Sequence, residues 1–261
     1  MKSLLTFLIT SLLLTFHASA AVVVQNGLTH IHDLQVNSTL EGTIILKNTG
    51  SKEERITVYF NDLSVNCDGQ ISYLEPGTSE HSLFPFLSVN NKDYTMQPGE
   101  EYELIYQIKM DNFNQEVGSL WSLIMIEMSD PISKTSTAQG LEIGSKVRYA
   151  IQLIGNVGQK NSEGMTYENV SLSKDQDGFN ILELSITNAG KFLVLPKTEL
   201  QIFDLNGQKI KDLKITTKKV YPNNCQRFIL PLTDLPSGDY KAVLVSEYQD
   251  EAIGVNIDLK I

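Results

Sequence analysis

The feature that most constrains the fold is a two-residue alternation of apolar and polar side chains in short runs. Runs such as TIILKN, RITVYF, YELIYQIKM and YKAVLVSEY are rich in Val, Ile, Tyr and Phe, and Gly, Pro, Asn or Asp separate them. Alternation of this kind between turn residues is typical of half-buried strands. Because no stretch keeps the 3.6-residue period of an amphipathic helix, the sequence predicts an all-β protein.

Two short motifs recur at nearly one spacing. LKNTG and ITNAG place Asn48 and Asn188 after an apolar strand, 140 residues apart, and strands open after Gly99 and Gly238, 139 residues apart. Turns with Asn and Gly are common in any β protein, which is the alternative interpretation. With about seven strands per copy, the repeat predicts two tandem immunoglobulin-like β-sandwiches. We expect the first domain over residues 21–157, the second over 165–261, and the boundary in the polar stretch NVGQKNSEG.

The first twenty residues, MKSLLTFLITSLLLTFHASA, have the pattern of a secretory signal. One Lys precedes an apolar stretch from Leu4 to Phe16, and Ala18-Ser19-Ala20 forms an A-x-A cleavage site. The stretch is shorter than the roughly 20 residues that a membrane span needs. We therefore expect a signal peptide over residues 1–20 and an exported protein, in the periplasm or at the cell surface, that does not span the membrane.

The charge balance is acidic. The chain has 261 residues with 21 Lys and Arg against 31 Asp and Glu. Loss of Lys2 with the signal peptide leaves 20 against 31, a net charge of −11. This balance argues against nucleic acid or an anionic membrane surface as a partner.

The two cysteines, Cys67 and Cys225, lie far apart and fall in different predicted domains. A disulfide framework usually has more cysteines at closer spacing. The favoured interpretation is two unpaired thiols, with an inter-domain bridge as the alternative.

Motifs that would carry catalysis are missing from the sequence. There is no G-x-S-x-G elbow, P-loop or H-E-x-x-H. HIHD places His30 and His32 on one face of a strand. The alternative interpretation is a metal site that uses both rings and Asp33, but Asp33 points to the opposite face and no third ligand is evident. We expect a solvated strand face there, no catalytic, cofactor or metal site, and no enzymatic activity.

The run GSLWSLIMIEMSDP is apolar on both faces. Between Leu120 and Met128 only Ser122 and Glu127 are polar, and the run is too short for a membrane span. In a strand, Trp121 and its alternate neighbours must face opposite to Ile124 and Ile126. We expect a core strand, with Trp121 in the core of the first sandwich.

The first half of the chain resembles the PapD-like domains of periplasmic pilus chaperones. The resemblance is carried by STLEGTIILKNTGSKEERITVYF, YTMQPGEEYELIYQIKM, GSLWSLIMIEM and GLEIGSKVRYAIQLIGNV. In that family an Arg of the first strand and a Lys of the last strand hold the terminal carboxylate of the subunit. Here VVVQNGLTHIHDLQV contains no Arg, and only Lys146 or Arg148 could stand for the Lys.

The resemblance implies a partner-binding role for the strand that follows the apolar run. We expect residues 147–153 to pair with that run and to lie at the margin of the sheet, where unpaired backbone groups can add a strand from a partner. The predicted partner-binding residues are Lys146, Arg148, Tyr149, Ile151 and Leu153. The alternative is that the opposite sheet and the second domain cover both faces of this strand.

Two further resemblances widen the functional expectation. The two halves together are similar to WxL-interacting cell-surface proteins, which bind peptidoglycan, and LQIFDLNGQKI with LPSGDYKAVLV resembles the sorting domain of type IX secretion cargo. The main hypothesis is an exported, non-enzymatic binding or assembly protein of the bacterial envelope, contacting another envelope protein or cell-wall glycan. The alternatives are secretion cargo or a structural surface subunit.

Overall fold

The computed structural model describes residues 22–111, 113–114, 116–129, 133–136, 142–160, 164–233, 235–249 and 251–261. The expected signal peptide lies outside the described residues. The described chain is all β, apart from one 3-10 turn, η1 (Phe84–Phe86). No helix among the described residues is long and apolar enough to cross a membrane.

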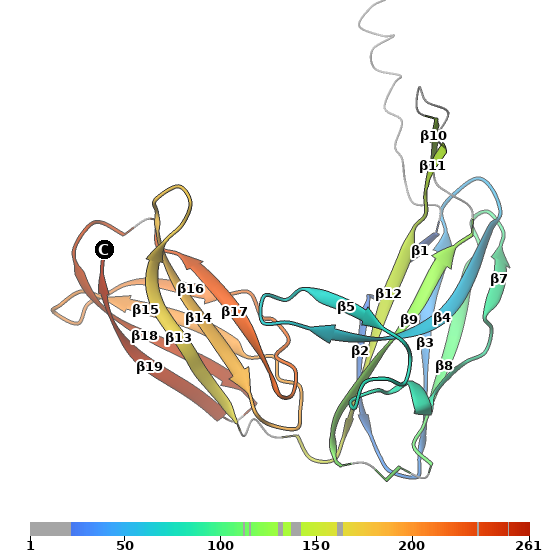
Figure 1. Cartoon of the computed structure of the whole chain (residues 1–261), viewed down its shortest axis with the longest axis horizontal. Coiled ribbons are helices and arrows are strands. Elements are labelled where there is room, and N and C mark those ends of the chain that lie inside the picture. Colours follow the sequence, from blue (N-terminus) through green and yellow to red (C-terminus); the bar gives the residue numbers. More distant parts are fainter. Residues whose placement is uncertain are drawn as a thin grey trace, which may run out of the picture.

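The chain forms two β-sandwiches, one after the other (Figure 1). The strands of the first are β1 (Val22–Val24), β2 (Thr29–Leu34), β3 (Thr39–Asn48), β4 (Glu54–Val65), β5 (Ile71–Leu74), β6 (Leu87–Val89), β7 (Asp93–Met96), β8 (Glu101–Lys109), β9 (Gly118–Met128), β10 (Ser133–Ser136), β11 (Glu142–Ser145) and β12 (Arg148–Val157). The strands of the second are β13 (Met165–Lys174), β14 (Asn180–Asn188), β15 (Lys197–Phe203), β16 (Lys209–Ile215), β17 (Asn224–Pro231), β18 (Asp239–Tyr248) and β19 (Glu251–Lys260).

Each sandwich packs two sheets face to face. In the first, a sheet of order β1-β3-β8-β6 faces a sheet of order β2-β12-β9-β4-β5, in which β7 also pairs with β4. The hairpin of β10 and β11 in the first half of the chain forms a separate two-stranded sheet. In the second sandwich, β13-β14-β17 faces β16-β15-β18-β19. The chain changes sheets between β1 and β2, so that β2 lies parallel to β12 while the other pairings are antiparallel.

The repeated Asn motif has the same structural role in both sandwiches. The amide of Asn48 donates to the carbonyls of Lys52 and Met96, and its Oδ1 accepts from the Gly50 N–H. Asn188 is also buried and donates to the carbonyls of Phe192 and Val220, while accepting from the Gly190 N–H. Each Asn satisfies backbone groups of the chain turning out of a strand, which explains why both copies need this residue.

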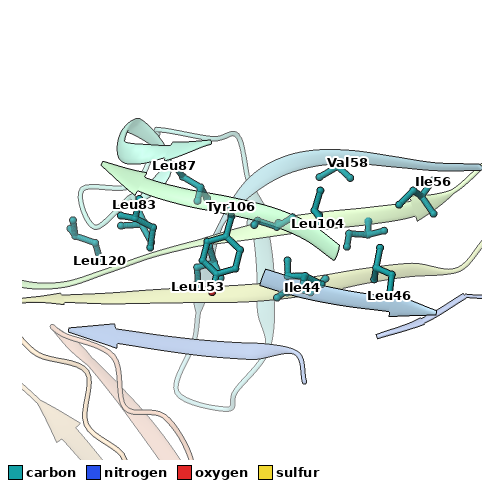
Figure 2. Close-up of a cluster of buried hydrophobic side chains, with 14 of the residues drawn as sticks. Ile44, Leu46, Ile56, Val58, Leu83, Leu87, Leu104, Tyr106, Leu120 and Leu153 are labelled. Carbon is teal, nitrogen blue, oxygen red and sulfur yellow. The ribbon is translucent and has the colours of Figure 1, made fainter. Parts of the chain in front are cut away.

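The core of the first sandwich lies between its two sheets. Figure 2 shows side chains of β3, β4, β8 and β12 meeting there, with Tyr106 beside Leu153. Ile124 and Ile126 of β9 belong to this core and are fully buried. Burying a side chain of this size contributes about 1.5–3 kcal/mol, so these alternating residues fix which face of β9 points inward.

The expectation that Trp121 belongs to the core of the first sandwich is wrong. Trp121 is buried, but it packs with Leu123 and Met125 in a separate cluster on the outer face of the sheet, against Leu193 and Tyr221 of the second sandwich. The indole Nε1 donates to the carbonyl of Leu63 at 3.0 Å. Alternation correctly separates the two faces of β9, but it cannot tell which element covers each face.

The expectation of two unpaired thiols is also wrong, because Cys67 and Cys225 form a disulfide between the two domains. Cys67 lies in the turn between β4 and β5, a hairpin that reaches toward the second sandwich (Figure 1). Beside the disulfide, the Arg227 N–H donates to the Cys67 carbonyl at 2.6 Å, and Arg227 pairs with Asp68 at 3.1 Å. Sequence distance misleads here because the second domain folds back onto the hairpin.

Candidate binding edge and interdomain cleft

The first part of β12 has a free backbone edge. On one side, Arg148–Val157 pairs with β9 along its whole length. On the other side, β2 pairs only with Gln152–Val157, and no described strand pairs with residues 148–151. The predicted pairing with the apolar run is confirmed. Of the residues predicted at the margin of the sheet, 147–153, the position holds for 148–151 and is wrong for 152 and 153, because the N-terminal chain crosses over from the other sheet and pairs with them as β2.

The direction of the free peptide groups follows from two hydrogen bonds. The Val147 carbonyl accepts from Met128 on the β9 side, whereas the Gln152 N–H donates to the Leu28 carbonyl on the opposite side. Because peptide groups alternate in direction along a strand, the N–H and C=O groups of Arg148 and Ala150 point to the free edge. These are the groups that an added strand would pair with.

The predicted partner-binding residues fall into three environments. Ile151 and Leu153 are fully buried in the first core, and neither side chain is exposed to a partner. Tyr149 is half-buried, and its hydroxyl donates to the Val22 carbonyl at 2.7 Å, so it links the margins of the two sheets.

Lys146 and Arg148 are directed to a carboxylate of the same domain. Both side chains are about half exposed and bond Glu127, Lys146 at 3.2 Å and the Nε of Arg148 at 2.9 Å. Their bonds lower the pKa of Glu127, with the Arg148 bond as the largest cause. Neither lies among the residues that line the cleft described next.

A cleft of about 530 Å³ lies between the two domains, where the free edge of β12 meets β2. Its first-domain wall is mainly apolar and includes Leu63, Val65, Leu123 and Ala150. Its second-domain wall is the segment that connects β16 with β17 and carries two cations, Lys218 and Lys219. The exposed side chains of Leu28, Ile71 and Tyr73 form its rim.

Lys219 is a half-buried cation held by neutral groups. Its ammonium donates to Gln152 Oε1 at 2.6 Å and to Thr29 Oγ1 at 3.0 Å, and Gln152 in turn donates to the Tyr221 hydroxyl at 2.7 Å. Among the described residues, no carboxylate forms an ion pair with it. Asp68, the acidic residue of the cleft, pairs with Arg227. Burial lowers the pKa of Lys219, and a carboxylate arriving in the cleft would supply the missing countercharge.

Sequence reasoning missed Lys219. It lies in the segment TTKKVYP, where two adjacent lysines look equally solvated. In the structure Lys218 is exposed and lies over the ring of Phe228, whereas Lys219 reaches across to β2 and β12. Only the position of the second domain distinguishes the two.

The expectation that His30 and His32 form a solvated face is wrong. Both rings are half-buried and lie within hydrogen-bonding distance of the Tyr106 hydroxyl, whose own burial raises its pKa to about 12. Asp33 points away and pairs with Lys160 at 2.6 Å. Among the described residues, no group of three or more His, Cys, Asp or Glu is placed to hold a metal ion.

Comparisons with known proteins give matches in structure alone. No protein-family model matches the sequence, and no curated protein matches it. The chain is similar in fold to PapD-like fimbrial chaperones. It is 13% identical to the class 5 fimbriae chaperone CfaA, covering 92% of this chain and 99% of that chain with a TM-score of 0.48. It is 12% identical to the chaperone YadV, with 92% of this chain and 100% of that chain covered and a TM-score of 0.48. It is 11% identical to a chain of the chaperone–tip adhesin complex of CFA/I fimbriae, with 92% of this chain and 98% of that chain covered and a TM-score of 0.48.

Proposed function

We propose that this chain is an exported, non-enzymatic binding or assembly protein of the bacterial envelope, which holds an extended segment of another envelope protein along the free edge of β12. The first domain, residues 21–157, presents the edge, and the second domain, residues 165–261, closes the cleft below it. The observation that carries the proposal is the unpaired edge at Arg148 and Ala150, which leads directly into a cleft containing Lys219.

The free edge favours a protein partner over cell-wall glycan. A partner strand would continue the sheet through its own N–H and C=O groups, which a polysaccharide does not have. It would lie in line with β2 and bring an acidic group to Lys219. Arg148 stays at the outer end of the edge, where its charge discourages strands that lack a complementary partner group.

A pair of substitutions at Ala150 tests this proposal. Ala150→Pro removes the N–H that points to the free edge without removing a bond to β9, and proline is tolerated at such edge positions. We expect a folded protein that loses capture of its envelope partner, measured by cross-linking in intact cells followed by affinity purification of the tagged chain. Ala150→Val keeps the N–H at similar bulk and should retain capture. Equal capture by both variants, with both folded, would contradict strand addition at this edge.

A further inference from the structure

The hydroxyl of Tyr106 sits between two histidines that face into the first sandwich. Tyr106 Oη lies 3.0 Å from His30 Nδ1 and 2.8 Å from His32 Nε2. Tyr106 is 1% exposed, and its ring passes so close to β3 that a Cβ on Gly42 would lie 2.3 Å from it. The tyrosine is therefore fixed in the core. The two histidines lie on β2, which is the edge strand of the facing sheet.

Hydrogen-bond capacity requires at least one of these rings to be neutral. A phenol has one proton, so it can donate to one histidine nitrogen while accepting from the other. If both rings are protonated, both nitrogens become donors and the buried phenol proton has no acceptor between them. His30 Nε2 is also buried with no partner among the described residues, so a second proton on that ring would leave a buried N–H unsatisfied.

The surroundings of His32 favour its neutral ring. Burial is the largest cause that lowers the pKa of His32, the charge of His30 lowers it further, and Asp33 opposes both. Asp33 is paired with Lys160, and Tyr106 of β8 stays neutral. The residues of β12 that pair with the two histidines, Leu153 and Gly155, do not titrate.

The attachment of β2 to the sheet depends on this arrangement. Of the three side chains of β2 that face the core, only Leu34 is apolar and buried, and it packs over Gly155. The other two are His30 and His32, while Ile31 on the outer face is 43% exposed. Apart from Leu34, β2 is therefore held by polar contacts: its ladder bonds to β12, the hydrogen bonds to Tyr106, the ion pair of Asp33 with Lys160 and the hydrogen bond of Thr29 with Lys219.

We propose that β2 is a strap over the β12 edge, and that protonation of His32 beside Tyr106 releases it. Release uncovers the edge of residues 152–157 next to residues 148–151, with which no described strand pairs on that side, so the free edge becomes longer in acid. The release itself is a property of the chain alone, whereas its effect on partner affinity rests on the proposed function. Because the folded-state pKa of His32 is lowered, the stability of the strap is complete above the unfolded value of 6.5 and falls as the pH drops through it.

Hydrogen exchange of the full-length protein without a partner tests the strap. We compare amide protection at about pH 7.5 and about pH 5.5, on either side of the ordinary histidine pKa of about 6.5, after correction for intrinsic exchange rates. We expect residues 29–34 and the β12 amides that face them to exchange roughly tenfold or more faster at the lower pH, with β3 and β8 unchanged, since a tenfold change needs about 1.4 kcal/mol.

The double variant His30→Gln, His32→Gln should remove this pH response, because glutamine keeps a neutral hydrogen-bonding side chain. His81→Gln, on the other side of the sheet beside Trp121, should leave it intact. If the double variant does not fold, His32→Gln alone should reduce the response. Equal protection at both pH values, loss of protection across the whole first sandwich, or a response that persists without the histidines would overturn the strap. The two proposals can fail separately. If the strap opens at low pH but the Ala150→Pro variant still captures its partner, the proposed function is contradicted and the strap is not.

Discussion

Replacing Trp121 by alanine is expected to lower the free energy of unfolding by about 3–5 kcal/mol, as for other buried aromatic side chains. The indole is 5% exposed, stacks on His81 with ring centroids 4.7 Å apart, and meets the edge of Tyr221 at 4.9 Å. Its removal leaves a cavity and frees the Leu63 carbonyl that accepts its N–H. Urea denaturation followed by circular dichroism measures the loss.

Phe179→Ala provides the control, because Phe179 is also aromatic but 53% exposed; it should change stability by about 0.5 kcal/mol or less. A second measurement separates the interface from an ordinary core. Small-angle X-ray scattering should show a wider distribution of distances between the domains in the Trp121 variant, although the disulfide keeps them tied together. An unchanged unfolding free energy, or a loss with no change in scattering, would place Trp121 outside the interdomain contact.

Replacing Lys219 by methionine is expected to weaken partner capture by roughly tenfold or more, since a hydrogen bond to a charged group contributes about 1.5–3 kcal/mol. Folding should not suffer, because the neutral side chain removes the cost of burying an ammonium whose hydrogen-bond partners among the described residues, Gln152 and Thr29, are both uncharged. Capture from cross-linked cells and a thermal scan of the same variant measure the two effects.

Lys218→Met is the matched control in the same wall of the cleft. Its ammonium donates to the Arg227 carbonyl and lies over the Phe228 ring, both in the second domain, whereas that of Lys219 donates to β2 and β12. We expect its partner capture to remain near that of the unmodified chain. Equal losses in both variants would indicate a general effect of positive charge, and no loss in either would remove Lys219 from the site.

Much of the strand arrangement was predictable from alternation. The run around Trp121 became β9, the following strand became β12, and the two pair as expected, with Ile151 opposite Ile124. Alternation also placed Trp121 and Ile124 on opposite faces. It could not reveal that the second domain covers the Trp121 face, because a sequence pattern reports burial without naming the covering element.

The rest depended on contacts between distant segments. The disulfide joins residues 158 positions apart, and its formation needs the hairpin of β4 and β5 to reach the second sandwich. Lys219 acquires its position only when the domains meet. His30 and His32 looked solvated because the sequence does not show that Tyr106 lies opposite them, 76 and 74 residues away.

The most direct test of strand addition at β12 is site-specific photo-cross-linking in native cells. A photoreactive phenylalanine analogue at Arg148, on the free edge, is compared with the same analogue at Ile229, an exposed position of β17 in the second sandwich. We predict a discrete adduct with another envelope protein from position 148 and none from position 229, with mass spectrometry locating the adduct in one short segment of that protein. Equal adducts from both positions, or adducts from Ile229 alone, would contradict the account.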